Sequence, residues 1–242
     1  MAQVPSLKEV RLDQPGAKRA FNRAHFAAAA SRYDFATKAL SLGGDARWKR
    51  RLIEALPGRA GACLDLACGT GDVAFLLAAK FPAAQIEGLD LSREMLAVAG
   101  RRKTLGDRIR LVEGDLGLLP QPSASVDVVT GAYALRNAPD LRQALSEIHR
   151  VLTPGGTAAF LDFSKPDSGL GQKIQYGLLQ FWGGLWGLLL HGNRSVHGYI
   201  AASLRTYPTR SQLDELFRAW GFEKKLSRRF YGGMVELTLW QK

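Results

Sequence analysis

A glycine-rich turn, Gly69-Thr70-Gly71, lies between a predicted strand that contains Asp65 and a predicted helix that opens at Asp72. A strand, a tight turn and a helix in this order often bind a nucleotide-like ligand. A dinucleotide site would carry a third glycine, but this chain has alanine there. The two acids would repel a diphosphate and hold a cation, which favours S-adenosylmethionine. A plain turn with solvated acids is the alternative.

Two more acids follow predicted strands. Asp90 ends an apolar run about 20 residues after the glycines, where a carboxylate can bind ribose hydroxyls. Asp115 follows the next predicted strand, where it can accept a hydrogen bond from an adenine amino group. Because the carboxyl ends of parallel strands meet at one edge of a sheet, these acids are expected to share one site.

The apolar pattern predicts the elements that position these acids. Strands are expected over residues 64–67, 86–89, 109–112, 126–130, 157–162 and 234–240, a turn over 154–156, and helices over 21–39, 45–56, 92–100, 141–152 and 211–220, besides the helix from Asp72. This alternation predicts an α/β fold with a doubly wound, mostly parallel sheet and additional N-terminal helices.

Composition sets the domain organisation. Residues 1–20 are expected to be irregular, because proline and glycine interrupt any periodicity, and residues 21–242 are expected to form one domain. The hydrophobic content of 46% is ample for a core. Cys63 and Cys68 match no zinc-site spacing and suggest no disulfide framework, so a cytoplasmic location and no metal are expected.

The net charge of +11 lies towards the two ends of the chain. Residues 1–60 carry 12 Lys+Arg against 5 Asp+Glu, residues 61–199 carry 13 of each, and residues 200–242 carry 8 against 4. A basic face made by both ends could attract anionic lipid headgroups, and a solvated basic surface is the alternative. No RNA-binding signature accompanies these charges, so no nucleic-acid partner is expected.

Three segments carry a resemblance to a known family. YDFATKALSLGGDARWKR and LRNAPDLRQALSEIHRVLTPGG are similar to the two signatures of the ubiquinone/menaquinone biosynthesis C-methyltransferases, the UbiE family. DLACGTGD is similar to the cofactor motif of the wider class I S-adenosylmethionine-dependent methyltransferases. The resemblance implies a Rossmann-like methyltransferase that methylates the ring of a prenylated quinol, either demethylmenaquinol or 2-polyprenyl-6-methoxy-benzoquinol. A methyltransferase for another small lipophilic or aromatic acceptor is the alternative, and a binding protein without turnover is a third.

The resemblance also implies roles for individual residues. The turn would surround the methionine part of S-adenosylmethionine, Asp90 would hold the ribose, and Asp115 with Leu116 the adenine. Ring methylation requires loss of a phenolic proton, and Arg136 and Asn137 are the catalytic candidates because they could orient a water or stabilise a phenolate. A polar loop cap is the alternative for this pair. The expected cofactor-binding residues are Asp65, Gly69, Thr70, Gly71, Asp90, Leu91, Asp115, Leu116 and Ala132.

The chain departs from the family pattern at several positions. Asp45 stands where the family usually has histidine, and Ala132 stands where many members have serine. Ala36-Thr37-Lys38 replaces the usual Met-Asn-Asp. The changes at Asp45 and Ala36-Thr37-Lys38 are expected to lie near the substrate.

One apolar segment, residues 169–192, remains. Its uninterrupted part, residues 176–190, covers about 15 residues and contains glycines, whereas a membrane span needs roughly 20. We interpret it as a helix within a substrate-lid insertion over residues 169–205, which receives a prenyl tail or lies in the membrane interface with Trp182 and Trp186 at the headgroups. A core helix or a homodimer contact is the alternative.

Overall fold

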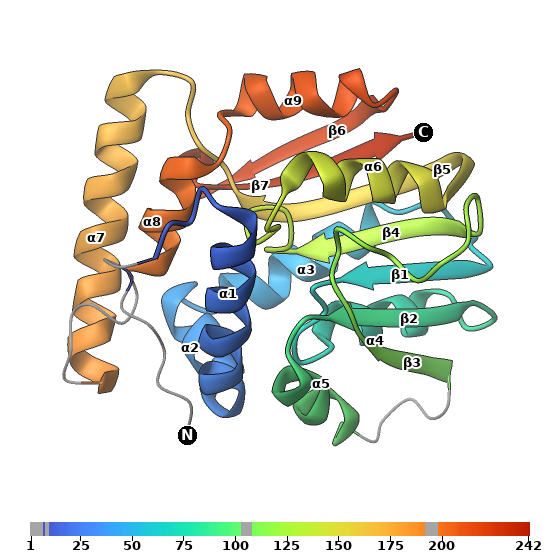
Figure 1. The fold of residues 1–242 in the computed structure, drawn as a ribbon, viewed down its shortest axis with the longest axis horizontal. Helices are drawn as coiled ribbons and strands as arrows, with labels where there is room; N and C mark the ends of the chain where they lie inside the picture. Colours follow the sequence, from blue (N-terminus) through green and yellow to red (C-terminus); the bar gives the residue numbers. More distant parts are fainter. Residues whose placement is uncertain (1–6, 8–9, 103–107, 192–197) are drawn as a thin grey trace.

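The computed structural model describes residue 7 and residues 10–102, 108–191 and 198–242. Part of the predicted irregular N-terminus and residues 192–197 of the predicted lid insertion lie outside these residues. Within them, seven strands form one sheet in the order β3-β2-β1-β4-β5-β7-β6, in which only β7 is antiparallel to its neighbours (Figure 1). The strands are β1 (Ala62–Leu66), β2 (Gln85–Asp90), β3 (Ile109–Glu113), β4 (Val126–Ala132), β5 (Leu152–Phe163), β6 (Glu223–Phe230) and β7 (Val235–Gln241). The predicted doubly wound, mostly parallel sheet is confirmed.

The helices cover both faces of the sheet and the carboxyl ends of its parallel strands. Figure 1 shows α1, α2 and α8 gathered at those ends, with α7 beyond them at the left of the view. The helices are α1 (Pro15–Ala29), α2 (Tyr33–Leu40), α3 (Gly44–Glu54), α4 (Asp72–Lys80), α5 (Arg93–Gly100), α6 (Leu141–Val151), α7 (Gly169–His191), α8 (Tyr199–Thr206) and α9 (Arg210–Ala219), with 3-10 turns η1 (Ala30–Arg32) and η3 (Tyr231–Gly233).

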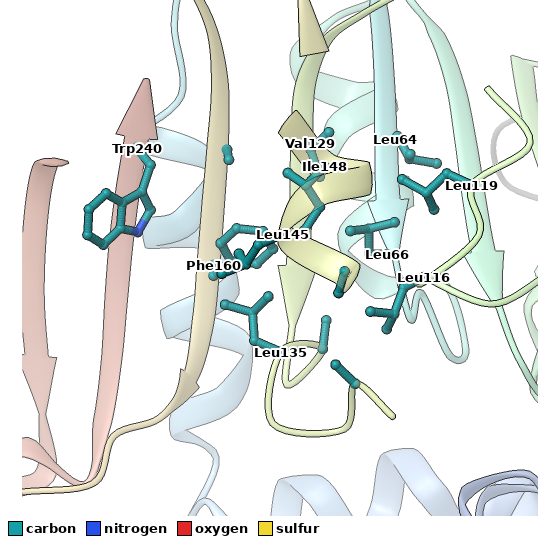
Figure 2. Close-up of a cluster of buried hydrophobic side chains, with 14 of the residues drawn as sticks. Leu64, Leu66, Leu116, Leu119, Val129, Leu135, Leu145, Ile148, Phe160 and Trp240 are labelled. Carbon is teal, nitrogen blue, oxygen red and sulfur yellow. The ribbon is translucent and has the colours of Figure 1, made fainter. Parts of the chain in front are cut away.

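Alternating side chains of the strands build a core on each face of the sheet. Leu64 and Leu66 of β1 pack with α6 residues such as Leu145 (Figure 2). Cys63, which directly precedes Leu64 in the strand, packs on the opposite face with Leu52 of α3 and residues of α4. Because a strand alternates its side chains between two faces, this strand is buried on both sides. The buried sheet thereby gives the site a rigid floor.

The N-terminal prediction needs correction. Helix α1 begins at Pro15, six residues before the expected start at Phe21. Proline has a fixed φ that suits the first helical turn, where its missing N–H is not needed, so Pro15 starts a helix here. The helix expected over residues 21–39 is also divided, since the 3-10 turn η1 separates α1 from α2.

Two features at the C-terminal side of the sheet also differ from the predictions. Pro154-Gly155-Gly156 lies inside β5, where β5 pairs with β4 at Leu152 and again from Thr157 onward. Gly155 has a φ of +77°, so the expected turn is an irregularity within a strand. Strand β6 was not predicted because its sequence, EKKLSRRF, is mostly polar, as suits a strand at the edge of a sheet.

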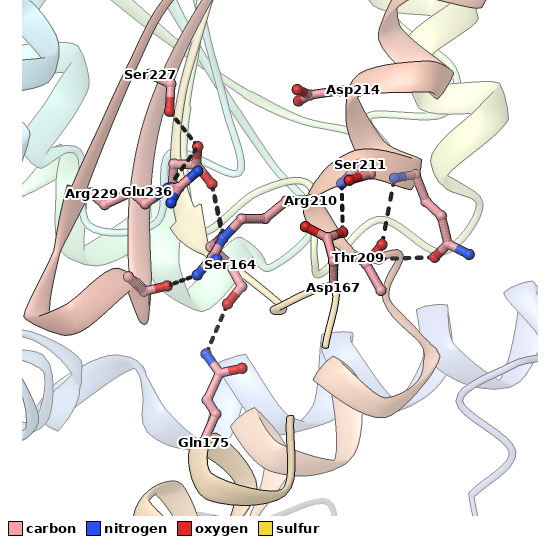
Figure 3. A network of polar contacts seen from close by, with 12 residues as sticks. Ser164, Asp167, Gln175, Thr209, Arg210, Ser211, Asp214, Ser227, Arg229 and Glu236 are labelled. Atoms are coloured by element: carbon pink, nitrogen blue, oxygen red, sulfur yellow. Dashed lines mark hydrogen bonds and ion pairs between the residues drawn. The ribbon is translucent and has the colours of Figure 1, made fainter. Parts of the chain in front are cut away.

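A polar network fixes the beginning of α7 to the sheet (Figure 3). Gln175 Nε2 donates to the Ser164 carbonyl at 2.8 Å, and Arg210 Nε donates to Ser164 Oγ at 2.6 Å. Ser164 Oγ in turn donates to Glu236 Oε2 of β7 at 2.7 Å. These bonds join α7 and α9 to β5 and β7, so the start of α7 is rigidly placed. None of the helices in the described parts of the chain has the length and apolarity needed to cross a bilayer.

Candidate active site

A cavity of about 570 Å³, open solvent included, lies at the carboxyl ends of β1 to β4. This is the point at which the strand order reverses, because β2 pairs with one side of β1 and β4 with the other. Ligands of doubly wound sheets bind at such points. Seven of the predicted site residues line the cavity: Gly69, Asp90, Leu91, Asp115, Leu116, Ala132 and Asn137.

Two residues of the glycine turn lie behind the cavity wall. Thr70 is buried, and its Oγ1 donates to Asp34 Oδ1 of α2 at 2.6 Å. Gly71 precedes α4 with a φ of +89°, and a Cβ there would lie 2.8 Å from the Phe75 ring. Both observations explain the sequence of the turn. Gly71 allows the positive φ and the close approach to Phe75, and Thr70 joins the turn to α2.

Asp65 also lies behind the wall, with one carboxylate oxygen unpartnered. Its Oδ1 accepts a hydrogen bond from Thr130 Oγ1 at 2.8 Å, whereas Oδ2 has no partner among the described residues. The side chain is almost fully buried, and this burial raises the pKa of Asp65 to about 7. An unsatisfied buried oxygen is costly, so a positive group close by would be bound favourably. The ammonium and sulfonium groups of S-adenosylmethionine suit this oxygen.

Asp72, the other acid beside the turn, does not offer a free charge. Its Oδ2 accepts a hydrogen bond from Lys49 Nζ at 3.0 Å, and its Oδ1 pairs with Arg102 Nη1. Although burial opposes ionisation, these two cations lower the pKa of Asp72. The attraction for a cation that the sequence assigned to both acids therefore rests on Asp65.

Asp90 presents a fixed carboxylate to the cavity. Its Oδ2 accepts from the Gly69 amide and its Oδ1 from the Ser92 amide, both at 2.8 Å. Burial raises the pKa of Asp90, and the amides favour its charged form. Each oxygen keeps a free lone pair, which is what two vicinal ribose hydroxyls would need.

Helix α1 covers the cavity from the side opposite the sheet. Asp115 Oδ1 accepts from the Gly117 amide at 2.8 Å, and its Oδ2 pairs with Arg19 of α1. One turn later, Asn22 Nδ2 donates to the Asn137 carbonyl at 2.7 Å. Asn22 was not among the predicted site residues, although a polar side chain next to the buried Phe21 of this helix is a detectable signal.

Asn137 is held at the cavity wall by its side-chain amide. Its Nδ2 donates to the Tyr133 carbonyl at 2.7 Å. Tyr199 Oη of α8 lies 2.9 Å from Asn137 Oδ1 and 2.6 Å from Asn22 Oδ1. Helices α1 and α8 therefore both contact the loop after β4 at Asn137, α1 through its backbone carbonyl and α8 through its side chain.

Arg136 does not line the cavity. Its guanidinium is 4% exposed, lies 3.6 Å from Asp162 Oδ1 of β5 and donates to Ser203 Oγ of α8. It also lies over the rings of Phe163 and Tyr199. The two predicted catalytic candidates are thus separated, with Asn137 at the wall and Arg136 in the interior.

A second buried cation lies close to Arg136. Lys18 of α1 is 7% exposed, and burial, aided by the charge of Arg136, lowers the pKa of Lys18 to about 8. Asp162 is the nearby carboxylate that compensates both charges. In the described residues, no group of three or more His, Cys, Asp or Glu side chains is arranged to hold a metal ion.

Comparisons with known proteins identify the family and the fold. Residues 16–241 match the model of the ubiE/COQ5 methyltransferase family. The demethylmenaquinone methyltransferase of Thermus thermophilus is 36% identical over 86% of this chain and 95% of its own length. The ubiquinone/menaquinone biosynthesis C-methyltransferase UbiE of Desulfotalea psychrophila is 34% identical over 91% of this chain and 88% of its own length. Among solved structures, a methyltransferase in complex with the Trm112 activator of Haloferax volcanii has a TM-score of 0.66 at 20% identity, covering 89% of this chain and 96% of that one.

Proposed function

Because this chain belongs to the ubiE/COQ5 methyltransferase family, we propose that it methylates a ring carbon of a prenylated quinol. It is an S-adenosylmethionine-dependent methyltransferase of quinone biosynthesis. The names of its relatives support demethylmenaquinol or 2-polyprenyl-6-methoxy-benzoquinol as the acceptor. The observation that carries the proposal is the cavity in which acids from the ends of neighbouring strands face Asn137 and the aromatic residues of α1 and α2.

The residues of the cavity fit S-adenosylmethionine, which would supply an electrophilic methyl group. Asp90 would hold the ribose, Asp115 and Leu116 the adenine, and the free oxygen of Asp65 would attract the ammonium group. Gly69 leaves room beside these acids for the ligand. Burial from water strengthens each of these interactions, because the local dielectric constant is low.

Asn137 would position the acceptor ring. Its amide is fixed by Tyr199 and by the Tyr133 carbonyl, so little ordering is needed when a substrate binds. Arg136 would act indirectly, since it holds Asp162 and α8 in place behind Asn137. This division of roles assigns orientation of the ring to Asn137 and stability of the wall to Arg136.

We further propose that α7 receives the lipophilic part of the acceptor at a membrane surface. Five large apolar side chains lie exposed along one face of this helix: Leu170, Ile174, Leu178, Phe181 and Leu185. Their spacing of three or four residues places them in one stripe, which we call the α7 stripe. The helix contains no acidic residue and one lysine, Lys173, a composition compatible with anionic lipids.

The opposite face of α7 is seated on the protein. Tyr176 and Leu179 pack against the core, and Trp182 Nε1 donates to the Leu40 carbonyl of α2 at 3.0 Å. Because α2 also supplies Tyr33 to the cavity, α7 lies close to the route by which a lipid would enter. Each exposed side chain that leaves water would contribute roughly 25 cal/mol per Å² of apolar area.

Cofactor binding tests the first part of the proposal. Calorimetry should detect S-adenosylmethionine binding, and Asp90→Ala should weaken it by roughly 1.5–3 kcal/mol because a charged hydrogen-bond acceptor is lost. The exposed Asp13, which pairs with Arg11 and is not part of the cavity lining, provides the control Asp13→Ala. Unchanged affinity in a folded Asp90 variant would remove this residue from the site.

Complementation tests the acceptor. The gene should restore quinone methylation in a host that lacks its own C-methyltransferase, and mass spectrometry of the host's quinones would distinguish menaquinone from ubiquinone products. The alternative acceptor class would be favoured if neither quinone is restored and the purified protein methylates another lipophilic or aromatic compound.

A further inference from the structure

Tyr133 lies directly after β4, lines the cavity and has a backbone φ of +61°. This left-handed conformation is costly for a residue with a side chain, and it persists only where the surroundings hold it. Two hydrogen bonds do so here. The Tyr133 amide donates to the Leu161 carbonyl and the Tyr133 carbonyl accepts from Asn137 Nδ2, each at 2.7 Å. The turn that holds Asn137 therefore also fixes Tyr133 at the cavity.

The hydroxyl of Tyr133 meets a buried carboxylate. Tyr133 Oη donates to Asp45 Oδ1 of α3 at 2.7 Å, and the Asp45 side chain is only 9% exposed. Asp45 Oδ2 lies 2.7 Å from Lys49 Nζ, which also donates to Asp72. Although burial opposes the charge of Lys49, these two carboxylates raise the pKa of Lys49. Lys49 therefore keeps an ammonium charge beside Asp45 Oδ2, while Asp45 Oδ1 faces the Tyr133 hydroxyl.

We propose that Tyr133 and Asp45 form the proton relay that removes the ring hydroxyl proton of the acceptor. This inference rests on the proposed function, because a quinol must occupy the cavity beside Tyr133. The O–H bond of the acceptor breaks as its proton moves to Tyr133 Oη. The O–H bond of Tyr133 breaks at the same time, and that proton moves to Asp45 Oδ1. The acceptor becomes a phenolate, Tyr133 stays neutral, and Asp45 becomes a carboxylic acid.

The relay also runs in reverse, which balances the reaction. The phenolate increases electron density at the ring carbon that receives the methyl group, and the methylated ring is then a neutral dienone that still carries its ring hydrogen. Loss of this hydrogen to water as a proton restores the aromatic ring. The proton on Asp45 returns through Tyr133 to the ring oxygen. One proton is released overall, and both residues regain their starting states.

Neighbouring groups suit a relay rather than a stored phenolate on tyrosine. Burial and the charge of Asp45 raise the pKa of Tyr133 well above its ordinary value, so its hydroxyl gives up a proton only when it gains one. The other titratable or charged groups that face the pair are Tyr33 of α2, Lys49 of α3 and Asp162 of β5. Burial raises the pKa of Tyr33 as well, and Asp45 is the carboxylate that the Tyr133 hydroxyl contacts directly.

The test compares Tyr133→Phe and Asp45→Asn with the control Tyr231→Phe. Tyr231 Oη donates to the Ser41 carbonyl beside α3, outside the cavity, so the control removes a hydroxyl near the same helices. Turnover with demethylmenaquinol or the polyprenyl benzoquinol is measured across pH, and S-adenosylmethionine affinity is measured by calorimetry. We expect both relay variants to lose about 10²-fold or more in kcat at neutral pH, with unchanged cofactor affinity.

The pH profile separates a relay from a structural role. In Tyr133→Phe the loss should shrink as the pH approaches the pKa of the free quinol, because solution then supplies the phenolate. A loss that is equal at every pH, or wild-type kcat in folded Tyr133→Phe, would overturn the relay while leaving the proposed function intact. A wild-type protein that methylates neither quinol would instead contradict the proposed function, and the relay with it.

Discussion

At the scale of single residues, the acids at and behind the cavity wall differ in how their charges are compensated. Asp90 is fixed by two backbone amides, Asp72 is paired with two side-chain cations, and Asp65 keeps one oxygen without a partner. Burial raises the pKa of Asp65 to about 7, so its carboxyl changes protonation near neutral pH. Asp65 is therefore the residue at which cofactor binding and pH should be coupled.

We expect S-adenosylmethionine binding to release a proton below pH 7, because Asp65 has a pKa of about 7 in the free protein and a bound cation lowers it. Well above that pH, Asp65 is already ionised and no proton should be released. Calorimetry in buffers with different ionisation enthalpies measures this proton. In Asp65→Asn, the number of protons released should be the same in both pH ranges. If the difference between the ranges persists, the released proton does not come from Asp65.

The same group predicts how the stability of the free protein depends on pH. Burial raises the pKa of Asp65 from 3.8 to about 7, so between these values the folded state holds a proton that the unfolded state lacks. The contribution of Asp65 therefore lowers the free energy of unfolding as the pH rises through this window. Urea unfolding should show that the free energy of unfolding falls less steeply with pH in Asp65→Asn than in the wild type. Equal slopes against pH would exclude this contribution.

Arg136 and Asn137 should differ in what their substitution changes. Arg136→Ala leaves Asp162 without its nearest cation in the interior, and we expect a loss of about 3–5 kcal/mol in the free energy of unfolding. Asn137→Ala should lower turnover with a smaller effect on stability. Urea unfolding and steady-state kinetics measure both quantities, and the reverse ranking would mean that the two roles are exchanged.

At the scale of elements, α7 is a helix with one face seated on the protein and one apolar face exposed. Its start is fixed by the Ser164 network, so the α7 stripe is presented by a rigid base. An exposed apolar stripe of this size is unusual on a soluble surface and indicates a site of contact.

We expect Leu178→Gln and Phe181→Ser to weaken binding to anionic vesicles and to lower turnover of long-tailed quinols. Each substitution removes apolar surface that would contact lipid or the prenyl tail. A tailless ring acceptor should be turned over almost as well as by the wild type. Leu118 is 74% exposed but lies after β3, so Leu118→Gln is the matched control. Equal losses with tailless and long-tailed acceptors would contradict a role in tail binding.

Local patterns explain why most elements could be predicted from the sequence. The buried strands are short runs of apolar residues, and the helix after Ser92 begins at a capping residue. Both signals can be recognised from a few neighbouring residues. Asp90 and Asp115 were predicted to share a site because each follows a strand of one parallel sheet. Asn22 and Tyr199 could not be placed with Asn137, because helices far apart in the chain bring them together.

At the scale of the whole molecule, α1 closes the cavity through contacts that a ligand can reinforce. Arg19 pairs with Asp115 at the proposed adenine site, and Asn22 donates a hydrogen bond to Asn137 at the proposed acceptor site. Helix α1 therefore contacts both sites. A cofactor beneath this helix would hold it more firmly. We therefore expect α1 to move when the cofactor is exchanged.

Amide hydrogen exchange in α1 should therefore slow when S-adenosylmethionine binds, and exchange in α9, which packs beside β6 (Figure 1) and does not line the cavity, should change little. Mass spectrometry of peptic fragments from the full chain measures both helices in one experiment. If exchange slows equally in both helices, cofactor binding stabilises the protein as a whole. If exchange in α1 does not slow, α1 does not cover the site.

The position of β7 bears on how the molecule is made. This strand is the last along the sequence, yet it lies between β5 and β6 in the sheet. During synthesis, β5 and β6 are complete before the strand that joins them has emerged from the ribosome. Until then the hydrogen-bonding groups along one side of β5 are open to pairing with other chains. Nascent chains stalled before Val235 should therefore depend on chaperones to remain unaggregated.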